Sequence, residues 1–389
     1  MPSIEPFRIT QAVFTEMPVR GGSHWYFLEL SNADGITGLA EFSHGENSIA
    51  VSRAIAQMVE ELQEEVIVEE TGIPAMVGLS PAFLQSDRVL AAAITAIRNA
   101  VLDAQAQIAG VPLYRLLGGR DVESVELYGN INRSMLKNDS GDSNRSPASF
   151  AAVAERAAEE GFRNIKCAPF DECRAPFSGS GLPDEAMAGL DRIAAVKAAI
   201  GDKVNLFVDC HSRFDLESAL ALEPELAARG VSWYEEPVSY RTHRGDLAAI
   251  KNVATMDVAG AEDAYGVDIF QSLIVAGVTD VVMPDVKYCG GAGEAVLIGN
   301  TLEAISPGSV SMHSPGGPVS MLASAHATAA FNGSRPLEHA VWEVDWRATV
   351  LEPAEHIHDG HLFLPDGSGI GATLNEELMS RNGRRWSAT

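Results

Sequence analysis

The spacing of apolar residues changes character about a third of the way along the chain. In residues 1–50 apolar and polar positions alternate, as in strands that bury one face, and the NADG sequence at 32–35 is typical of a hairpin turn. Residues 51–72 and 81–110 instead repeat their apolar positions with helical spacing, and the second segment ends in glycine shortly before Pro112. These patterns predict a small α+β domain over residues 1–122.

Beyond residue 122, short apolar runs alternate with amphipathic helical stretches. Such a series, with about eight strand–helix units, predicts a parallel barrel over residues 123–349. An open, doubly wound sheet is the alternative, but no glycine-rich phosphate turn follows the first strand. Residues 350–389 resume short β-like pieces and are expected to pack back on the N-terminal domain. The predicted strands are 124–130, 164–168, 204–209, 232–236, 257–262, 280–285, 309–313 and the segment that reaches Glu338.

The predicted fold class is therefore α/β. It is a modified (β/α)8 barrel of the TIM type with an N-terminal α+β capping domain, which the C-terminal tail completes. The three expected parts are the capping domain (1–122), the catalytic barrel (123–349) and the tail (350–389).

Composition narrows the choice of partners. The 389 residues carry a formal net charge of −25, which argues against nucleic acid and anionic membranes as partners. An anionic substrate remains compatible, because a bound metal or a local lysine inverts the field at a site. No uninterrupted apolar run approaches the ~20 residues that span a bilayer. The four cysteines lack metal-site spacing and no signal peptide is evident, so we expect reduced thiols and a cytoplasmic protein.

Acidic residues occupy the ends of three consecutive predicted strands. The third barrel strand ends in Asp209, the fourth carries Glu235 and the fifth ends in Glu262. Because the carboxyl ends of barrel strands converge on one site, these carboxylates should repel one another unless a cation neutralises them. Oxygen ligands with room for water and substrate suit Mg²⁺. Glu236 and Asp263 should point away from their neighbours and are weaker ligand candidates.

The remaining strand ends predict acid–base chemistry. The sixth strand ends in Asp285 and the seventh in His313, so the acid is placed to fix the tautomer of the imidazole and raise its basicity. Glu338, at the eighth strand, is a candidate to donate a hydrogen bond when protonated or to orient the substrate. Lys166, on the second strand, is a candidate to neutralise a substrate carboxylate opposite the metal. His211 follows Asp209 by two residues, and an extended chain would turn both toward the site.

At these residues the chain resembles the enolase superfamily, mandelate racemase subgroup. The resemblance covers nearly the whole length, including LDAQAQIAGVPLYRLLGG at 102–119, which is similar to the last helix of the family's capping domain and its link to the barrel. The acids at the third to fifth strands, with EEP at 235–237, match the family's metal-binding triad. The sixth- and seventh-strand pair is similar to its His–Asp dyad.

The resemblance implies Mg²⁺-dependent abstraction of the proton α to a carboxylate, through an enediolate intermediate. Many relatives carry a Lys-x-Lys motif, whose second lysine is a base on the face opposite the histidine. This chain reads Lys166-Cys167-Ala168, so that base is missing. In galactonate-dehydratase-like relatives with the same Asp-x-His arrangement, the histidine is the acid for a leaving hydroxyl. The resemblance therefore implies that His313 takes the α proton and His211 protonates a departing β-hydroxyl.

The expected activity is dehydration of an acid sugar to a 2-keto-3-deoxy acid, a lyase reaction. A racemase or epimerase, with Lys166 or His211 as the opposite base, is the alternative. A barrel that only binds ligand, and a two-metal hydrolase, fit less well, because the charged set is complete and histidine-rich ligands are absent.

The capping domain should close the substrate pocket with its loops at 16–25 and 41–48. His44, in the second loop, is a candidate substrate ligand or a turn residue. Arg213 is a candidate to hold a distal hydroxyl or carboxylate of the substrate. The expected partners are a small carboxylate and further copies of the chain in a homo-oligomer.

Overall fold

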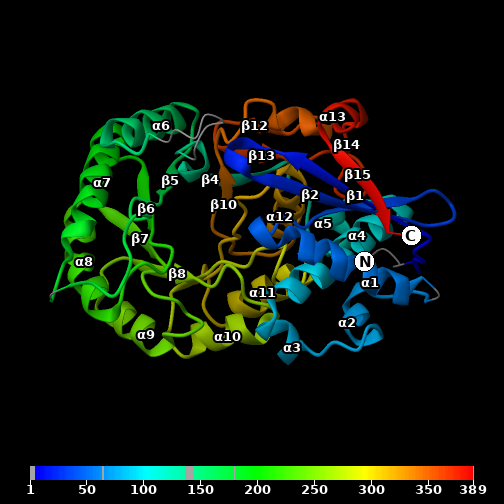
Figure 1. Ribbon diagram of the computed structural model, residues 1–389, viewed down its shortest axis with the longest axis horizontal. Helices are drawn as coiled ribbons and strands as arrows, with labels where there is room; N and C mark the ends of the chain where they lie inside the picture. The colour runs from blue at the N-terminus through cyan, green and yellow to red at the C-terminus, as the bar shows by residue number, and fades with distance from the viewer. Residues whose placement is uncertain (1–4, 64, 136–143, 179, 389) are drawn as a thin grey trace.

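The computed structural model describes residues 5–63, 65–135, 144–178 and 180–388. The capping domain contains an antiparallel sheet of order β15-β1-β2-β3 (Figure 1). Its strands are β1 (Gln11–Pro18), β2 (His24–Ser31), β3 (Thr37–Glu41) and, from the far end of the chain, β15 (Arg384–Ala388). Pairing of β15 with β1 therefore ties the C-terminal segment to the capping domain.

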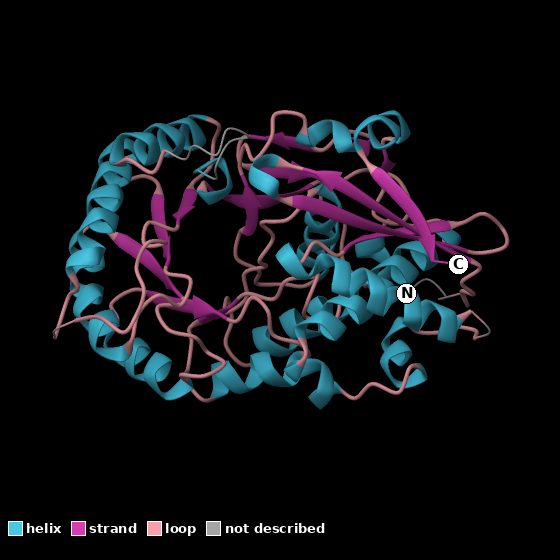
Figure 2. Cartoon of the chain, in the orientation of Figure 1, coloured by secondary structure: helices cyan, strands magenta, loops and turns pink. Residues whose placement is uncertain are grey.

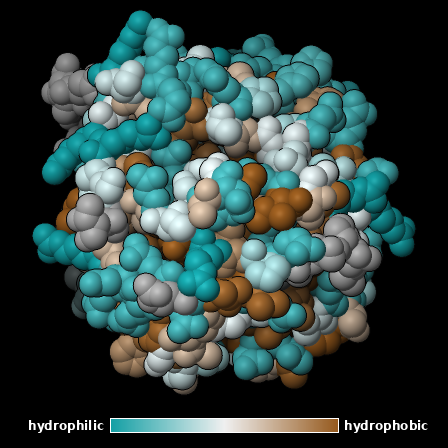
Figure 3. Space-filling view, turned by 90° about the vertical axis from the view of Figure 1, so that its right-hand side faces the viewer, coloured by the Kyte–Doolittle hydropathy of each residue, from teal (hydrophilic) through white to brown (hydrophobic). Residues whose placement is uncertain are grey.

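Helices cover one face of this sheet. The longest, α4 (Arg88–Ile108), packs against β3, and a Cβ atom at Gly38 would overlap the carbonyl of Ala100, so only glycine permits this close approach. By length and composition α4 could cross a membrane, but 89% of that stretch is buried, as in a core helix. The face of the molecule on the capping-domain side carries both hydrophilic and hydrophobic side chains (Figure 3). The helices are α1 (Ser48–Leu62), α2 (Ile73–Met76), α3 (Pro81–Ser86), α4 (Arg88–Ile108) and the linking α5 (Leu113–Leu116).

Parallel strands form the predicted barrel, and helices surround it (Figure 2). Tyr128, Phe207 and Trp233 fill its interior with smaller apolar side chains. The strands are β4 (Ser124–Asn130), β5 (Asn164–Cys167), β6 (Asn205–Asp209), β7 (Val231–Glu235), β8 (Asp257–Gly260), β9 (Val281–Val282) and β10 (Leu337–Ala340). The helices are α6 (Pro147–Glu159), α7 (Met187–Ile200), α8 (Leu216–Ala228), α9 (Arg244–Val253), α10 (Val267–Val275), α11 (Ala292–Glu303) and α12 (Pro318–Ala330).

The predicted seventh strand, 309–313, is not a regular strand. Val310 makes isolated bridges to Val282 on one side and Ser334 on the other, and these close the barrel. Pro284 and Pro336 lie in the flanking segments and lack N–H groups, so a continuous ladder cannot form there. For the same reason the predicted strand 280–285 is regular only over β9.

The tail divides between the two domains, so the prediction that all of it packs on the capping domain is only partly right. Two of its strands, β12 (His356–His358) and β13 (His361–Phe363), extend the barrel sheet instead. The reason is that the first residues of β4 extend beyond the start of β5 in the sheet. Since β4 pairs with β5 only at Gly129 and Asn130, these first residues are free to pair with β13. The other elements are β11 (Leu351–Glu352), β14 (Thr373–Leu374) and α13 (Glu376–Asn382).

Candidate active site

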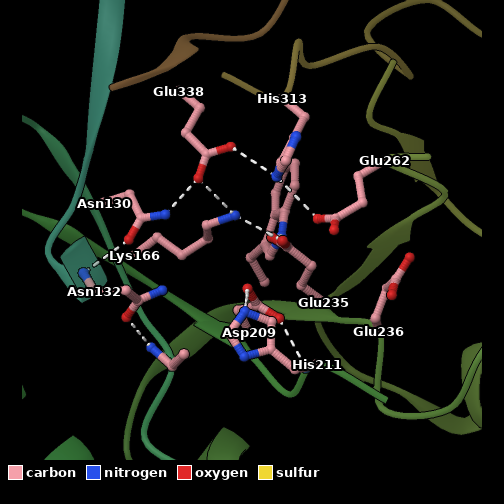
Figure 4. Close-up of polar contacts among 12 residues, drawn as sticks. Asn130, Asn132, Lys166, Asp209, His211, Glu235, Glu236, Glu262, His313 and Glu338 are labelled. Carbon is pink, nitrogen blue, oxygen red and sulfur yellow. Dashed lines mark hydrogen bonds and ion pairs between the residues drawn. The ribbon is translucent and has the colours of Figure 1, made fainter. Parts of the chain in front are cut away.

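The strand ends bring the predicted acids into one group (Figure 4). Asp209 on β6 pairs in register with Glu235 on β7. Each lies two residues beyond an aromatic side chain of the barrel interior, Phe207 or Trp233, and side chains two apart share a face of a strand. Both carboxylates therefore face the barrel axis, and both residues are nearly inaccessible, at 4% and 1% exposure.

Lys166 lies between two buried carboxylates. Its Nζ is 2.6 Å from Oε1 of Glu235 and 3.0 Å from Oε1 of Glu338. Burial alone would lower the pKa of Lys166, but attraction to these two acids outweighs it and raises the pKa well above its usual value. The predicted lysine is thus a fixed positive charge. Asn130 holds Glu338 from the other side, with its Nδ2 2.6 Å from Oε1.

The predicted pair of His313 and Asp285 is formed. Nδ1 of His313 lies 2.9 Å from Oδ2 of Asp285, and Nε2 lies 2.9 Å from Oε2 of Glu262. Burial would lower the pKa of His313, but Glu262 and Glu338 raise it well above its ordinary value. Because Nδ1 is held by Asp285, Nε2 is the ring atom that faces the other carboxylates of the site.

His211 reaches the site by a different route from the one predicted. β6 ends at Asp209, and His211 and Ser212 have φ of 48° and 55°, so the chain turns through the left-handed region instead of continuing extended. The imidazole nevertheless faces the site. Its Nε2 lies 2.9 Å from Oδ2 of Asp209, and its Nδ1 lies 2.7 Å from Oδ1 of Asp171. Attraction to Asp209 raises the pKa of His211 well above its ordinary value.

Glu236 departs from the predicted alternation. With φ of 39° it leaves the strand, and its carboxylate lies beside Glu262 (Figure 4). Its Oε1 accepts a hydrogen bond of 3.0 Å from the backbone N–H of Ala261. Burial, followed by repulsion from Glu262, raises the pKa of Glu236 to about 8. Asp263, by contrast, pairs with Arg88 and Arg241 away from the site.

Within the described ranges, no three Asp, Glu, His or Cys side chains are close enough together, as they stand, to hold a metal ion. Each predicted ligand is paired with a cation: Asp209 with His211, Glu235 with Lys166 and Glu262 with His313. Their donor type and charge nevertheless fit a hard divalent cation, because the carboxylates of the site outnumber its lysines. Four of the carboxylates are buried, Asp209, Glu235, Asp285 and Glu338, and two are half-buried, Glu236 and Glu262; the lysines, both buried, are Lys166 and Lys287.

Several residues of the site were not predicted from the sequence. Lys287 lies two residues after Asp285, and its Nζ is 3.2 Å from Oδ2 of that acid. This spacing repeats that of Asp209 and His211, so it is a signal that could have been used. Asn130 ends the first barrel strand, as the other site residues end theirs. Asp171 offers no such signal, because it lies in the irregular segment after β5.

His44 and Arg213, the two other predicted substrate ligands, have different surroundings. Nδ1 of His44 lies 2.8 Å from the hydroxyl of Tyr288, and burial lowers the pKa of His44 to about 4. His44 thus joins the capping loop to the barrel. The backbone carbonyl of Arg213 accepts a hydrogen bond from Ala175. Substrate binding by either side chain stays a prediction.

Comparison with known proteins points to the same family as the sequence motifs. A family model described as enolase C-terminal domain-like matches residues 149–378, more than half of the chain. The chain belongs to this family. The expected membership of the enolase superfamily and the expected fold class are both confirmed.

Relatives of this enolase-family chain include sugar-acid enzymes. It is 26% identical over 382 residues to D-xylonate dehydratase of Haloferax volcanii, covering 94% of this chain and 83% of the relative. It is 30% identical over 298 residues to D-galactarolactone cycloisomerase of Agrobacterium fabrum, covering 74% and 73%. The solved mandelate racemase/muconate lactonizing enzyme-like protein of Rubrobacter xylanophilus superposes with a TM-score of 0.85 at 25% identity, covering 97% of this chain and 98% of that one.

Proposed function

We propose that the protein is a Mg²⁺-dependent dehydratase of acid sugars, a lyase that forms 2-keto-3-deoxy acids. One observation carries the proposal. Each of two histidines has its Nδ1 held by an acid outside the predicted metal-ligand set, and its Nε2 faces a predicted ligand. The site therefore has two oriented acid–base groups around one buried charged centre. The dehydratase named among the relatives agrees with this chemistry.

The chain's own residues account for the proton movements. His313, oriented by Asp285, takes the proton from the carbon next to the substrate carboxylate, and the electron pair moves into that carboxylate to give an enediolate. Lys166 is a fixed positive charge close to the developing negative charge. His211 then protonates the hydroxyl on the next carbon, which leaves as water. The resulting enol takes up a proton at the carbon that lost the hydroxyl and becomes the keto acid.

The metal has a supporting role in this account. Asp209, Glu235 and Glu262 would hold Mg²⁺, which supplies positive charge against the substrate carboxylate. Binding requires these acids to leave their present partners, Lys166 and the two histidines. That exchange would free Nε2 of His313 and of His211 for proton transfer.

Racemisation or epimerisation of a carboxylate is the second candidate. The observation in its favour is that His211 is a second acid–base group, which could protonate the intermediate at the α carbon. Against it, the position two residues after Lys166, where many relatives have their second base, is the buried Ala168. A homo-oligomeric state remains a prediction.

A keto-acid assay tests the proposal. The protein is incubated with Mg²⁺ and a library of aldonates, aldarates and uronates, and 2-keto products are trapped with semicarbazide. We expect a signal with one or a few sugars that disappears in EDTA. Silence across the library, from protein that binds Mg²⁺, would contradict dehydration and favour epimerisation of another carboxylate.

A further inference from the structure

A cavity of about 330 Å³ lies between the capping domain and the open end of the barrel. Its volume is within the range of small-molecule sites, about 300–1,000 Å³. The capping side consists of residues 21–26, 43, 45 and 49, and the barrel side of Arg133, Lys287, Gly316 and Glu343. Lys287 also contacts Asp285, the partner of the predicted base, so the cavity adjoins the acid–base site.

Glu343 is an unusual member of this lining. The residue is 1% exposed, and neither carboxylate oxygen has a hydrogen-bond partner within the described residues. Its ion-pair partner is Arg133, whose Nη1 is 3.7 Å from Oε1, beyond hydrogen-bond distance. Buried carboxylates ordinarily accept hydrogen bonds, because an unsatisfied one loses its hydration without compensation. The arrangement leaves Glu343 ready to accept hydrogen bonds from a bound molecule.

A complementary donor comes from the other side of the cavity. Trp25, on β2 of the capping domain, also lines it, and its Nε1 is buried with no partner among the residues described. The ring is fixed by an edge contact with Trp346 and by the guanidinium of Arg347 above it. An acceptor and a donor, both unsatisfied, match hydroxyl groups, each of which donates and accepts.

The charges of the lining do not favour a second carboxylate on the substrate. The charge of Arg133 is opposed by Glu343, and that of Lys287 by Asp285. His24, the other basic residue of the lining, has its Nε2 3.9 Å from Oε1 of Glu16. A terminal carboxylate would therefore meet the acidic Glu343 with no surplus cation in the described lining to neutralise it.

We propose that this cavity binds the uncharged, hydroxylated end of a sugar monoacid, an aldonate, and that Glu343 selects it over the corresponding diacid. The inference rests on the proposed function and narrows its substrate class. Glu343 accepts hydrogen bonds from distal hydroxyls, and Trp25 donates one. The predicted closure of the pocket by the loops at 16–25 and 41–48 agrees with the lining, because residues 21–25, 43 and 45 belong to them.

The test compares matched substrates on wild type and Glu343→Gln. The pairs are D-gluconate with D-glucarate and D-galactonate with galactarate, each with Mg²⁺. Wild type should prefer the aldonates, and Glu343→Gln should lower their kcat/KM by about 10- to 100-fold, mainly through KM, as expected for lost hydrogen bonds to a charged group. The loss for aldarates should be smaller. Asp345→Asn, at an exposed position of the same loop, is the control and should change neither value more than about twofold.

A wild-type preference for aldarates, or unchanged aldonate kinetics in Glu343→Gln, would overturn the proposal. Should that variant fail to fold, Trp25→Phe removes the indole N–H together with part of the ring and should still raise KM for aldonates. Calorimetric binding of the same acids separates this inference from the proposed function. Aldonate binding that depends on Glu343, without keto-acid formation, would refute only the dehydratase. Keto-acid formation without dependence on Glu343 would refute only the specificity claim, and binding of neither class would refute both.

Discussion

Replacing Lys166 by methionine should destabilise the protein in a way that depends on Glu338. The lysine is fully buried and is the cation that separates Glu235 from Glu338. Methionine retains most of the volume but leaves two carboxylates buried without that charge. Removing one partner of a buried ion pair costs about 3–5 kcal/mol, because the remaining charge is uncompensated.

The size of the effect on melting temperature follows from chain length. An unfolding entropy of about 2.1 cal/mol/K per residue gives the 389-residue chain about 0.8 kcal/mol/K. The Tm of Lys166→Met should therefore fall by about 4–6 °C relative to wild type. Adding Glu338→Gln removes one of the unpaired charges, so the double variant should melt above the single variant.

Differential scanning fluorimetry in EDTA measures these shifts without a metal ion that could replace the lysine. Lys203→Met, at an exposed position, is the matched control and should change Tm by less than about 1 °C. A single variant that melts within 1 °C of wild type, or a double variant that melts below the single one, would refute the account of Lys166 as a charge-neutralising residue.

Three further predictions concern histidines. His313→Ala should slow exchange of the substrate α proton in D₂O by about 10²–10⁴-fold, and exchange at the wild-type rate would remove His313 as the base. His211→Ala should retain that exchange but stop keto-acid formation, and loss of both would show that His211 is not simply the acid. His326 is buried on α12, and burial lowers its pKa to about 4. As pH falls from 6.5 to 4, the unfolded chain therefore binds a proton at this histidine that the folded protein does not bind, which destabilises the fold. Urea unfolding at several pH values should show that wild type loses up to about 3 kcal/mol of its free energy of unfolding over that range, and that His326→Gln loses less. An equal loss in the two proteins would contradict this.

The sequence predicted the barrel and the residues at its rim because both follow from a repeated local pattern. An apolar run that ends in an acid, as at Asp209 or Asp285, marks both a buried strand and the end at which barrel sites form. The tail and the seventh strand were harder to predict, because they depend on which hydrogen-bonding groups neighbouring strands leave free. The prolines at 284 and 336 show this effect.

The finer features of the site depend on contacts between distant segments. Glu343 resembles any acid of a polar loop until the fold buries it beside Arg133 and the loops of the capping domain. The partner of His211, Asp171, lies 40 residues away in an irregular segment. Alternation along a strand also failed where the backbone has positive φ, at His211 and Glu236. Side-chain direction beyond a strand end is set by such turns, which local polarity does not reveal.

The most direct test of the central claim is proton NMR of D-xylonate, D-gluconate and D-galactonate incubated with the protein and Mg²⁺ in D₂O. The account predicts that at least one sugar acid is converted into a 2-keto-3-deoxy acid carrying a solvent deuteron at C3, with no conversion in EDTA. Recovery of the acids deuterated at C2, without any keto acid, would contradict dehydration and show that the site only exchanges or inverts the α carbon.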